Sequence, residues 1–306
     1  MAVLLLAIVL DLAFGDPPSR VHPVAGLGRA LAAGRRILCV GGPVRLLAGG
    51  AFVTLAAAAL AALAGALVAG LASMLGPWGV VPEVLALTLL LSLRGLARAA
   101  SGVRASLERG DLERARTEVG LHLVSRDTAA LDAGHVASAA VESVAENLTD
   151  SYVAPACFYL LFGLPGAAIY RAINTADAML GYRGGPLEHF GKTAARLDDL
   201  ANLLPARLAG IALVAAASVT GADARGAWST MLRDRGLTAS PNAGWTMAAM
   251  AGALGVTLEK SGAYRLGRGA LPTPADVTRS VRLTLVSAGL ATALLAIIWM
   301  VAKSAT

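Results

Sequence analysis

The sequence predicts an all-α integral membrane protein, a polytopic helical bundle with interrupted or re-entrant helices and cytoplasmic loops. Two observations of composition favour this class. Of the 306 residues, 56% are hydrophobic and only 15% are charged, a balance unlike that of a water-soluble domain. Aromatic residues make up only 5%, and Ala, Leu, Val and Gly dominate, which suits close helix packing better than a β-barrel with aromatic girdles.

A third observation is the length of the charge-free runs, since about 20 apolar residues cross a bilayer. We expect the spans near residues 51–75, 80–93 and 283–302. Three further apolar segments, 1–10, 151–170 and 208–222, are short or interrupted, and each fits either a kinked span or a broken helix lining a site. Residues 1–10 have no basic start and no small-residue cleavage pattern, so we expect this segment to be retained. No linker divides the chain, and we treat 1–306 as a single membrane domain.

Positive charge gathers in four loop regions, 20–45, 94–126, 171–207 and 225–282. The positive-inside rule places most of them in the cytoplasm, which predicts a multi-pass protein of the cell membrane with a cytoplasmic site. The segment 151–170 either crosses fully or re-enters, and the two alternatives put 171–207 on opposite sides. We assign the net charge of +6 to membrane orientation and to anionic substrates, not to nucleic acid.

Three carboxylates recur at helical spacing in the middle of the chain. Glu142, Glu146 and Asp150 are four residues apart, with Asn147 beside them, so a helix would stack them on one face. Stacked like charges repel, and we expect a cation or an arginine nearby. The pattern fits a Mg²⁺ site completed by substrate phosphate, or equally an acidic face or an arginine-paired network.

Two more polar clusters flank apolar segments. Arg171, Asn174 and Asp177 recur every three positions and can share one helix face. The second cluster places acids, amides and arginines at helical spacing, at Arg196, Asp198, Asp199, Asn202 and Arg207. Burying polar groups so close to lipid costs free energy unless they are paired. Both clusters are therefore candidates for function, and the alternative is a structural network that ties helices together.

Other motifs are excluded or left structural. Gly191-Lys192-Thr193 resembles the end of a P-loop, but Pro186 stands where the first glycine belongs. The four histidines and the two cysteines, Cys39 and Cys157, lack metal-ligand spacing. His22 lies in a rigid polar loop with Asp16, where a lone histidine is more often structural than catalytic.

Five motifs together resemble one known family. They are Asp11 to Pro17 with His22-Pro23, Ala140 to Asn147, Tyr170 to Tyr182, Ala195 to Asp199, and Ser240 to Gly244. In this order they resemble the CbiB/CobD family over nearly the whole chain. The chain departs from the family's aromatic-containing stretch at 188–193, and we assign no role there.

The resemblance implies adenosylcobinamide-phosphate synthase activity in cobalamin biosynthesis. Such a ligase joins aminopropanol phosphate to adenosylcobyric acid through an amide bond, with ATP as co-substrate and Mg²⁺ as the expected metal. The implied partners are a corrinoid, an amino-alcohol phosphate, the bilayer and other membrane enzymes of the pathway. Making an amide requires activation of a carboxylate followed by attack of a neutral amine, and both steps handle anions.

On this interpretation the candidate residues divide by role. Catalytic roles are predicted for Glu142, Glu146, Asp177, Asp198 and Asp199. Substrate binding is predicted for Asp16, His22, Asn147, Arg171, Asn174, Arg196, Asn202, Ser240 and Asn242. Metal binding is predicted for Glu142, Glu146 and Asp150. Two alternative classes remain. The first is a membrane transporter, which an inverted repeat would favour, although the chain shows none. The second is a non-catalytic membrane sensor of the same superfamily.

Overall fold

The computed structural model describes residues 1–304, which divide into two compact units. Unit 1 combines residues 1–92 with 154–202, and unit 2 combines residues 93–153 with the chain from 203 onward. Each unit is therefore built from two separate stretches of sequence. The expectation of a single domain stays a prediction.

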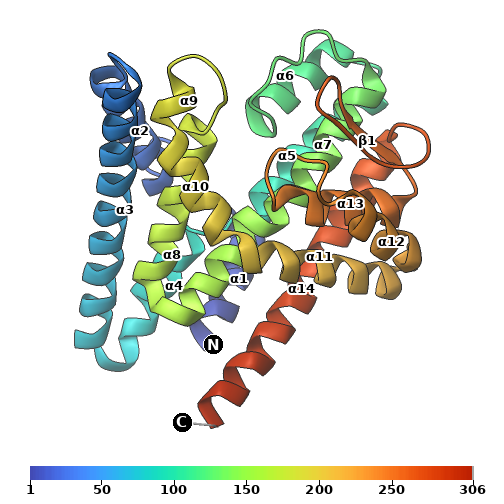
Figure 1. The fold of residues 1–306 in the computed structure, drawn as a ribbon. Coiled ribbons are helices and arrows are strands. Elements are labelled where there is room, and N and C mark those ends of the chain that lie inside the picture. The colour runs from blue at the N-terminus through green and yellow to red at the C-terminus, as the bar shows by residue number, and fades with distance from the viewer. Residues whose placement is uncertain (305–306) are drawn as a thin grey trace. The chain divides into compact units, whose positions relative to one another are not determined.

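Unit 1 is entirely helical within the described residues. Its elements in chain order are α1 (Ala2–Phe14), α2 (Pro23–Leu38), α3 (Pro43–Met74), the 3-10 turn η1 (Gly76–Gly79), α4 (Val80–Thr88), α8 (Ala154–Leu180), α9 (Leu187–Phe190) and α10 (Lys192–Ala201). Helix α3 runs alongside α8 and α2, and α9 packs against its first turns (Figure 1). Prolines begin α2 and α3, where the missing N–H would have no helical partner in any case.

The core of unit 1 depends on a glycine in α3. Phe190 and Leu180 are fully buried, and Leu46 packs in the same core. A Cβ atom at Gly50 would collide with the carbonyl oxygen of Phe190, so only glycine lets α9 approach α3 this closely.

This contact gives a stability prediction. Gly50→Ala is expected to lower the free energy of unfolding by about 1–3 kcal/mol, because the backbone of Phe190 must shift to make room. Gly70→Ala is the matched control in the same helix, since a Cβ there meets nothing within 4 Å. Ala favours a helix over Gly, so the control should be neutral or slightly stabilising. Thermal unfolding in detergent measures both, and equal melting temperatures would contradict the prediction.

Helix α8 is interrupted, as the sequence predicts. Gly163 has φ 67° and ψ −162°, and Pro165 follows it inside the helix. The backbone of Pro165 lies so close to α3 that a Cβ at Gly65 would come within 2.8 Å of its Cα atom. Gly65 therefore lets α3 pack directly against the break in α8.

Unit 2 has ten elements within the described residues. They are α5 (Leu93–Glu108), α6 (Leu112–His122), α7 (Ala133–Leu148), the π-helix η2 (Thr149–Val153), α11 (Leu203–Thr220), α12 (Ala224–Asp234), α13 (Ala243–Leu254), β1 (Thr257–Lys260), β2 (Tyr264–Gly267) and α14 (Pro274–Ser304). The strands form an antiparallel hairpin in which Leu258 pairs with Leu266. The hairpin packs on α7 and α13 (Figure 1). The all-α class is confirmed, and the hairpin is a small addition that the sequence analysis missed.

Five stretches of the described residues are long and apolar enough to cross a membrane. They are Pro43–Met74, Gly76–Glu108, Ala133–Leu180, Leu203–Thr220 and Pro274–Ser304. Three of these stretches cover the expected spans near 51–75, 80–93 and 283–302, and their crossing of the membrane stays a prediction. Two of the three ambiguous segments, 151–170 and 208–222, also fall largely within these stretches, while Ala2–Phe14 is shorter. Orientation across the membrane stays a prediction.

Candidate functional site

The carboxylate of Glu142 is buried in unit 2 and holds several partners. Its side chain is 6% exposed. The Ser138 hydroxyl donates to Oε1 at 2.7 Å, and the Tyr264 hydroxyl donates to Oε2 at 2.7 Å. Arg126 lies 3.6 Å from Oε2 and supplies the arginine partner that the stacked carboxylates require. We call these four residues the Glu142 cluster.

The β-hairpin is attached to this cluster from both strands. The backbone N–H of Glu259 donates to the Ser138 hydroxyl at 2.9 Å, and Tyr264 reaches Glu142 from the second strand. Burial, the charges of Glu142 and Glu146 and the hydrogen bond to Glu142 all raise the pKa of Tyr264. Its hydroxyl therefore stays protonated and donates throughout the physiological range.

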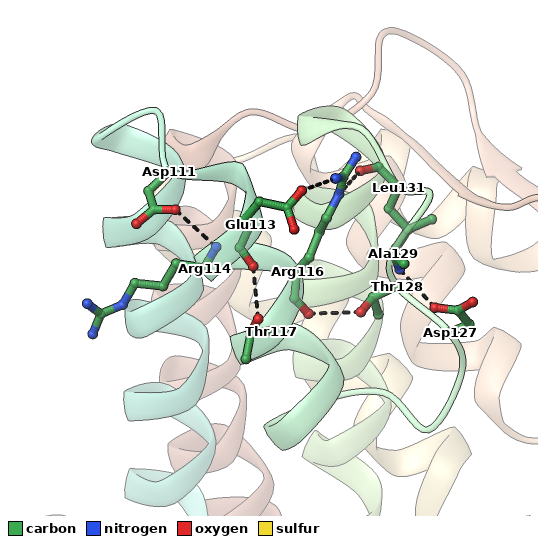
Figure 2. A network of polar contacts seen from close by, with 9 residues as sticks. All are labelled: Asp111, Glu113, Arg114, Arg116, Thr117, Asp127, Thr128, Ala129 and Leu131. Carbon is green, nitrogen blue, oxygen red and sulfur yellow. Dashed lines mark hydrogen bonds and ion pairs between the residues drawn. The ribbon is translucent and has the colours of Figure 1, made fainter.

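The loop that carries Arg126 is held by a second network, shown in Figure 2. Arg116 in α6 donates from Nε to the carbonyl of Leu131 at 2.7 Å, and another of its nitrogens pairs with Glu113. The Thr128 hydroxyl donates to the carbonyl of Arg116 at 2.9 Å. These bonds close the loop between α6 and α7 onto α6, which positions Arg126 for Glu142.

The Tyr264 hydroxyl gives a test of the hairpin's attachment. Tyr264→Phe leaves a buried carboxylate oxygen short of a donor, which costs about 1–3 kcal/mol. Amide hydrogens of the hairpin are expected to exchange at least about tenfold faster, which corresponds to about 1.4 kcal/mol. Tyr182→Phe is the control, because that hydroxyl donates only to the carbonyl of Ala178 in its own helix. Unchanged exchange in Tyr264→Phe would show that other contacts hold the hairpin.

The three predicted carboxylates lie in two different kinds of helix. Glu142 and Glu146 lie one turn apart in α7, and Asp150 follows in the π-helix η2. A π-helix bonds i to i+5, so the helical pitch changes between Glu146 and Asp150. Within residues 1–304, no three His, Cys, Asp or Glu side chains are grouped to hold a metal ion. Mg²⁺ binding by this set stays a prediction, and a protein cage of three carboxylates does not form.

Asn147 is engaged within its own helical segment. Its amide donates to the carbonyl of Ser143 at 2.9 Å, and its oxygen accepts from Ser151 at 3.1 Å. These bonds bridge α7 and η2 across the change of helical pitch. A substrate role for Asn147 stays a prediction beside this structural one.

Unit 1 contains a buried network around Asp198. Asn174 donates to Oδ1 at 3.1 Å, and Asn202 donates to Oδ2 at 3.0 Å. The Tyr170 hydroxyl in turn donates to the oxygen of Asn202 at 2.9 Å. Three of the predicted residues therefore meet, and α8 is tied to α10. Asp177 lies in electrostatic range of Asp198 and Asp199, which brings the predicted acids of unit 1 together.

Asp16 and His22 also meet in unit 1. The Ser92 hydroxyl donates to Asp16 at 2.6 Å, and His22 Nε2 lies 3.5 Å from the same carboxylate. His22 caps α2, since the N–H of Val24 donates to its Nδ1, and the ring proton is therefore on Nε2, facing Asp16. Burial acts to raise the pKa of Asp16, but hydrogen bonds from His22 and Ser92 and the charge of Arg171 leave that pKa lowered.

Arg171 lines a cavity of about 500 Å³ that lies wholly within unit 1. The cavity wall comes from α2, α3, α4 and α8, and Arg171 is the one charged residue among those that line it, all of which are described. A volume in this range is typical of small-molecule sites. By contrast, Arg196 is exposed on α10.

Ser240 and Asn242 lie in unit 2, in the turn before α13. Ser240 accepts from the N–H of Asn242 at 3.3 Å, and the side chain of Asn242 accepts from Arg207 at 3.0 Å. Sequence analysis assigned no role to Ser92, Arg126, Ser138, Tyr170 and Tyr264, although Tyr170 begins one of the five motifs. For the other four, the only signal was the expectation of an arginine near the α7 carboxylates, because isolated serines and tyrosines carry no spacing pattern.

These features define a polytopic α-helical membrane protein that holds buried carboxylates and amides, together with half-buried arginines. The chain matches the family model described as CobD/Cbib protein over residues 4–292, and it belongs to that family. No solved structure matches the chain.

Relatives from archaea and bacteria are similar over most of their length. The probable cobalamin biosynthesis protein CobD of Methanothermobacter thermautotrophicus is 43% identical over 87% of this chain and 86% of its own. The cobalamin biosynthesis protein CobD of Geobacter metallireducens is 41% identical over 90% and 86%, and that of Dehalococcoides mccartyi is 39% identical over 87% and 86%.

Proposed function

We propose that this chain acts in cobalamin biosynthesis as an amide-forming ligase that joins aminopropanol phosphate to adenosylcobyric acid at the expense of ATP. Membership of the CobD/Cbib family and the printed names of the relatives support the pathway. The particular reaction is the one that the five sequence motifs imply by resemblance.

The observation that carries the proposal is Arg171 on the wall of an apolar cavity. A guanidinium in such a setting binds carboxylate or phosphate through two parallel hydrogen bonds, and the low polarity around it strengthens them. Both the corrinoid carboxylate and the phosphates are anions of this kind. The apolar wall suits the hydrocarbon part of a substrate.

The reaction has two steps. A corrinoid carboxylate oxygen first takes a phosphoryl or nucleotidyl group from ATP, whose P–O bond breaks to release ADP or pyrophosphate. The neutral amine of aminopropanol phosphate then attacks the carbonyl carbon: the C–N bond forms, the activated C–O bond breaks to release phosphate or AMP, and the amine loses a proton. We assign the proton to one of the acids of unit 1, with Asp177 as the first choice because Asp198 is held by two amides.

The residues fit Mg²⁺ bound by one or two carboxylates and completed by water and phosphate, which is the usual arrangement for this ion. Glu142 and Glu146 lie one turn apart in α7 and are the candidate ligands. A bound Mg²⁺ supplies neutralisation of charge on the transferred group.

The test is synthesis by the purified full-length protein in nanodiscs. With adenosylcobyric acid, aminopropanol phosphate, ATP and Mg²⁺ present, mass spectrometry should detect adenosylcobinamide phosphate, and omission of any one component should abolish it. A folded protein that forms no product overturns the proposal. Corrinoid uptake into protein-containing vesicles without ATP would instead support the transporter class.

A further inference from the structure

Two arginines converge on one tryptophan in unit 2. The guanidinium carbon of Arg207 lies 4.8 Å from the centroid of the Trp245 ring, and that of Arg235 lies 4.9 Å from the same centroid. All three side chains are half-buried. Arg207 stands at the start of α11, Arg235 follows α12, and Trp245 is in the first turn of α13. We call these three residues the Trp245 cluster.

The hydrogen bonds of the cluster leave most of its donors available. Arg207 uses Nη1 for the carbonyl of Leu203 and the oxygen of Asn242, and Arg235 uses Nη1 for the carbonyl of Leu232. Within residues 1–304, the Nε and Nη2 atoms of both arginines make no hydrogen bond. A guanidinium has five donors in a planar fork, so each arginine can still offer a bidentate pair.

No carboxylate of the described chain lies within ion-pair distance of either guanidinium. The nearest acid in sequence, Asp234, is already committed, because Arg233 donates to both of its oxygens at 2.7 Å and the N–H of Gly267 donates to it at 2.8 Å. Two positive charges held against one ring repel each other, and cation–π attraction to Trp245 offsets this repulsion only in part. An anion bound between the two guanidinium groups would neutralise the remaining repulsion.

The Ser240 to Gly244 motif builds this arrangement. A Cβ atom at Gly244 would collide with the carbonyl of Arg235, so glycine lets the start of α13 pack against the end of α12. Asn242 then holds Arg207 in place through its side-chain oxygen. The motif therefore brings the two arginines together, although it contains neither of them.

We propose that the Trp245 cluster binds the phosphate group of a water-soluble substrate of the synthase, through Arg207 and Arg235. This inference rests on the proposed function, and it assigns to two arginines a role that the sequence motifs do not show. Arg207 begins a spanning segment, so a phospholipid headgroup offers the same chemistry from another source. The experiment separates the two sources.

The first arm measures binding to the full-length protein in nanodiscs of phosphatidylcholine alone, by titration calorimetry with aminopropanol phosphate and with ATP. Arg207→Lys and Arg235→Lys keep the charge but lose the fork, and each should raise the Kd of one of these ligands at least tenfold, with a matching rise in KM and little change in kcat. Arg282→Lys, at an exposed position of α14, is the control and should bind as the wild type does. Unchanged Kd values for both ligands overturn the proposal.

The second arm compares the melting temperature in nanodiscs with and without phosphatidylglycerol. An effect of the substitutions that is confined to the anionic lipid overturns the proposal and assigns the cluster to a headgroup. If the lysine variants fail to fold, tryptophan fluorescence of the wild-type protein tests the proposal instead. Aminopropanol phosphate or ATP should change the emission of the wild type, and Trp245→Phe should abolish this change. Emission that the ligand leaves unchanged would contradict the proposal.

The two proposals fail separately because binding is measured without turnover. If the wild-type protein binds phosphate but makes no amide, and the lysine variants lose the binding, then the Trp245 cluster is a phosphate site and the proposed function is wrong. If the wild-type protein makes the amide and both lysine variants have unchanged KM values, then the proposed function holds and the phosphate site is wrong.

Discussion

Arg171→Lys is expected to lower kcat/KM for the amide-forming reaction by at least about 100-fold, or about 2.7 kcal/mol of transition-state stabilisation. Lysine keeps the positive charge but replaces a planar fork by a point charge, so it cannot make two parallel bonds to a carboxylate or a phosphate. The cavity magnifies the loss, because its other lining residues are apolar and supply no substitute donor from a charged side chain. Steady-state synthesis measures the effect.

The control for this substitution is Arg45→Lys, at an exposed position near the start of α3 in the same unit. It makes the same chemical change outside the cavity and should retain wild-type kinetics. Melting temperatures of both variants should stay close to the wild type. If Arg171→Lys is fully active, Arg171 serves to balance the charge of Asp16 and takes no part in substrate binding.

Glu146→Gln is expected to reduce synthesis at least about 100-fold and to raise the Mg²⁺ concentration needed for half-maximal rate. The amide keeps the shape and hydrogen-bonding capacity of the side chain but removes the charge that a hard cation needs. Glu146 is a better test than Glu142, because substitution of Glu142 would also remove the acceptor of Ser138 and Tyr264. Activity titrated against Mg²⁺ gives both numbers.

Two comparisons sharpen the metal prediction. Glu108→Gln removes an acid that pairs with Arg104 at the end of α5, and it should leave the Mg²⁺ requirement unchanged. Asp150→Asn tests the third predicted ligand, which lies in η2 after α7, and a raised Mg²⁺ requirement in this variant would place Asp150 in the same site. Full activity of Glu146→Gln with an unchanged Mg²⁺ requirement would place Glu146 in a structural network with Tyr264 and Arg126.

The sequence by itself determined the class of fold. Charge-free runs of about 20 residues or more are long enough to cross a bilayer, so the candidate spans near 51–75 and 283–302 follow from local composition alone. The interruption of α8 is equally local, since Gly163 and Pro165 disturb helical hydrogen bonding wherever they occur. Helical spacing also placed Glu142 and Glu146 one turn apart in α7.

The errors arose where a local pattern was extended across a change in backbone geometry. A uniform helix was expected to continue to Asp150, but η2 changes the pitch after Leu148. The hairpin was missed because each strand has only four residues, too few for an alternating pattern to be recognised. Its packing against α7 and α13 stabilises it, and no short-range signal reports that packing.

Only the tertiary structure decided which polar groups meet. Glu142 receives Tyr264 from 122 residues away, and Asp198 receives Asn174 from 24 residues away. The cavity beside Arg171 and the two arginines on Trp245 likewise join segments that are distant in the sequence. The physical reason is that hydrophobic length and helical period act between near neighbours in the chain, whereas a buried carboxylate is satisfied by whichever donor the packed helices bring within about 3 Å.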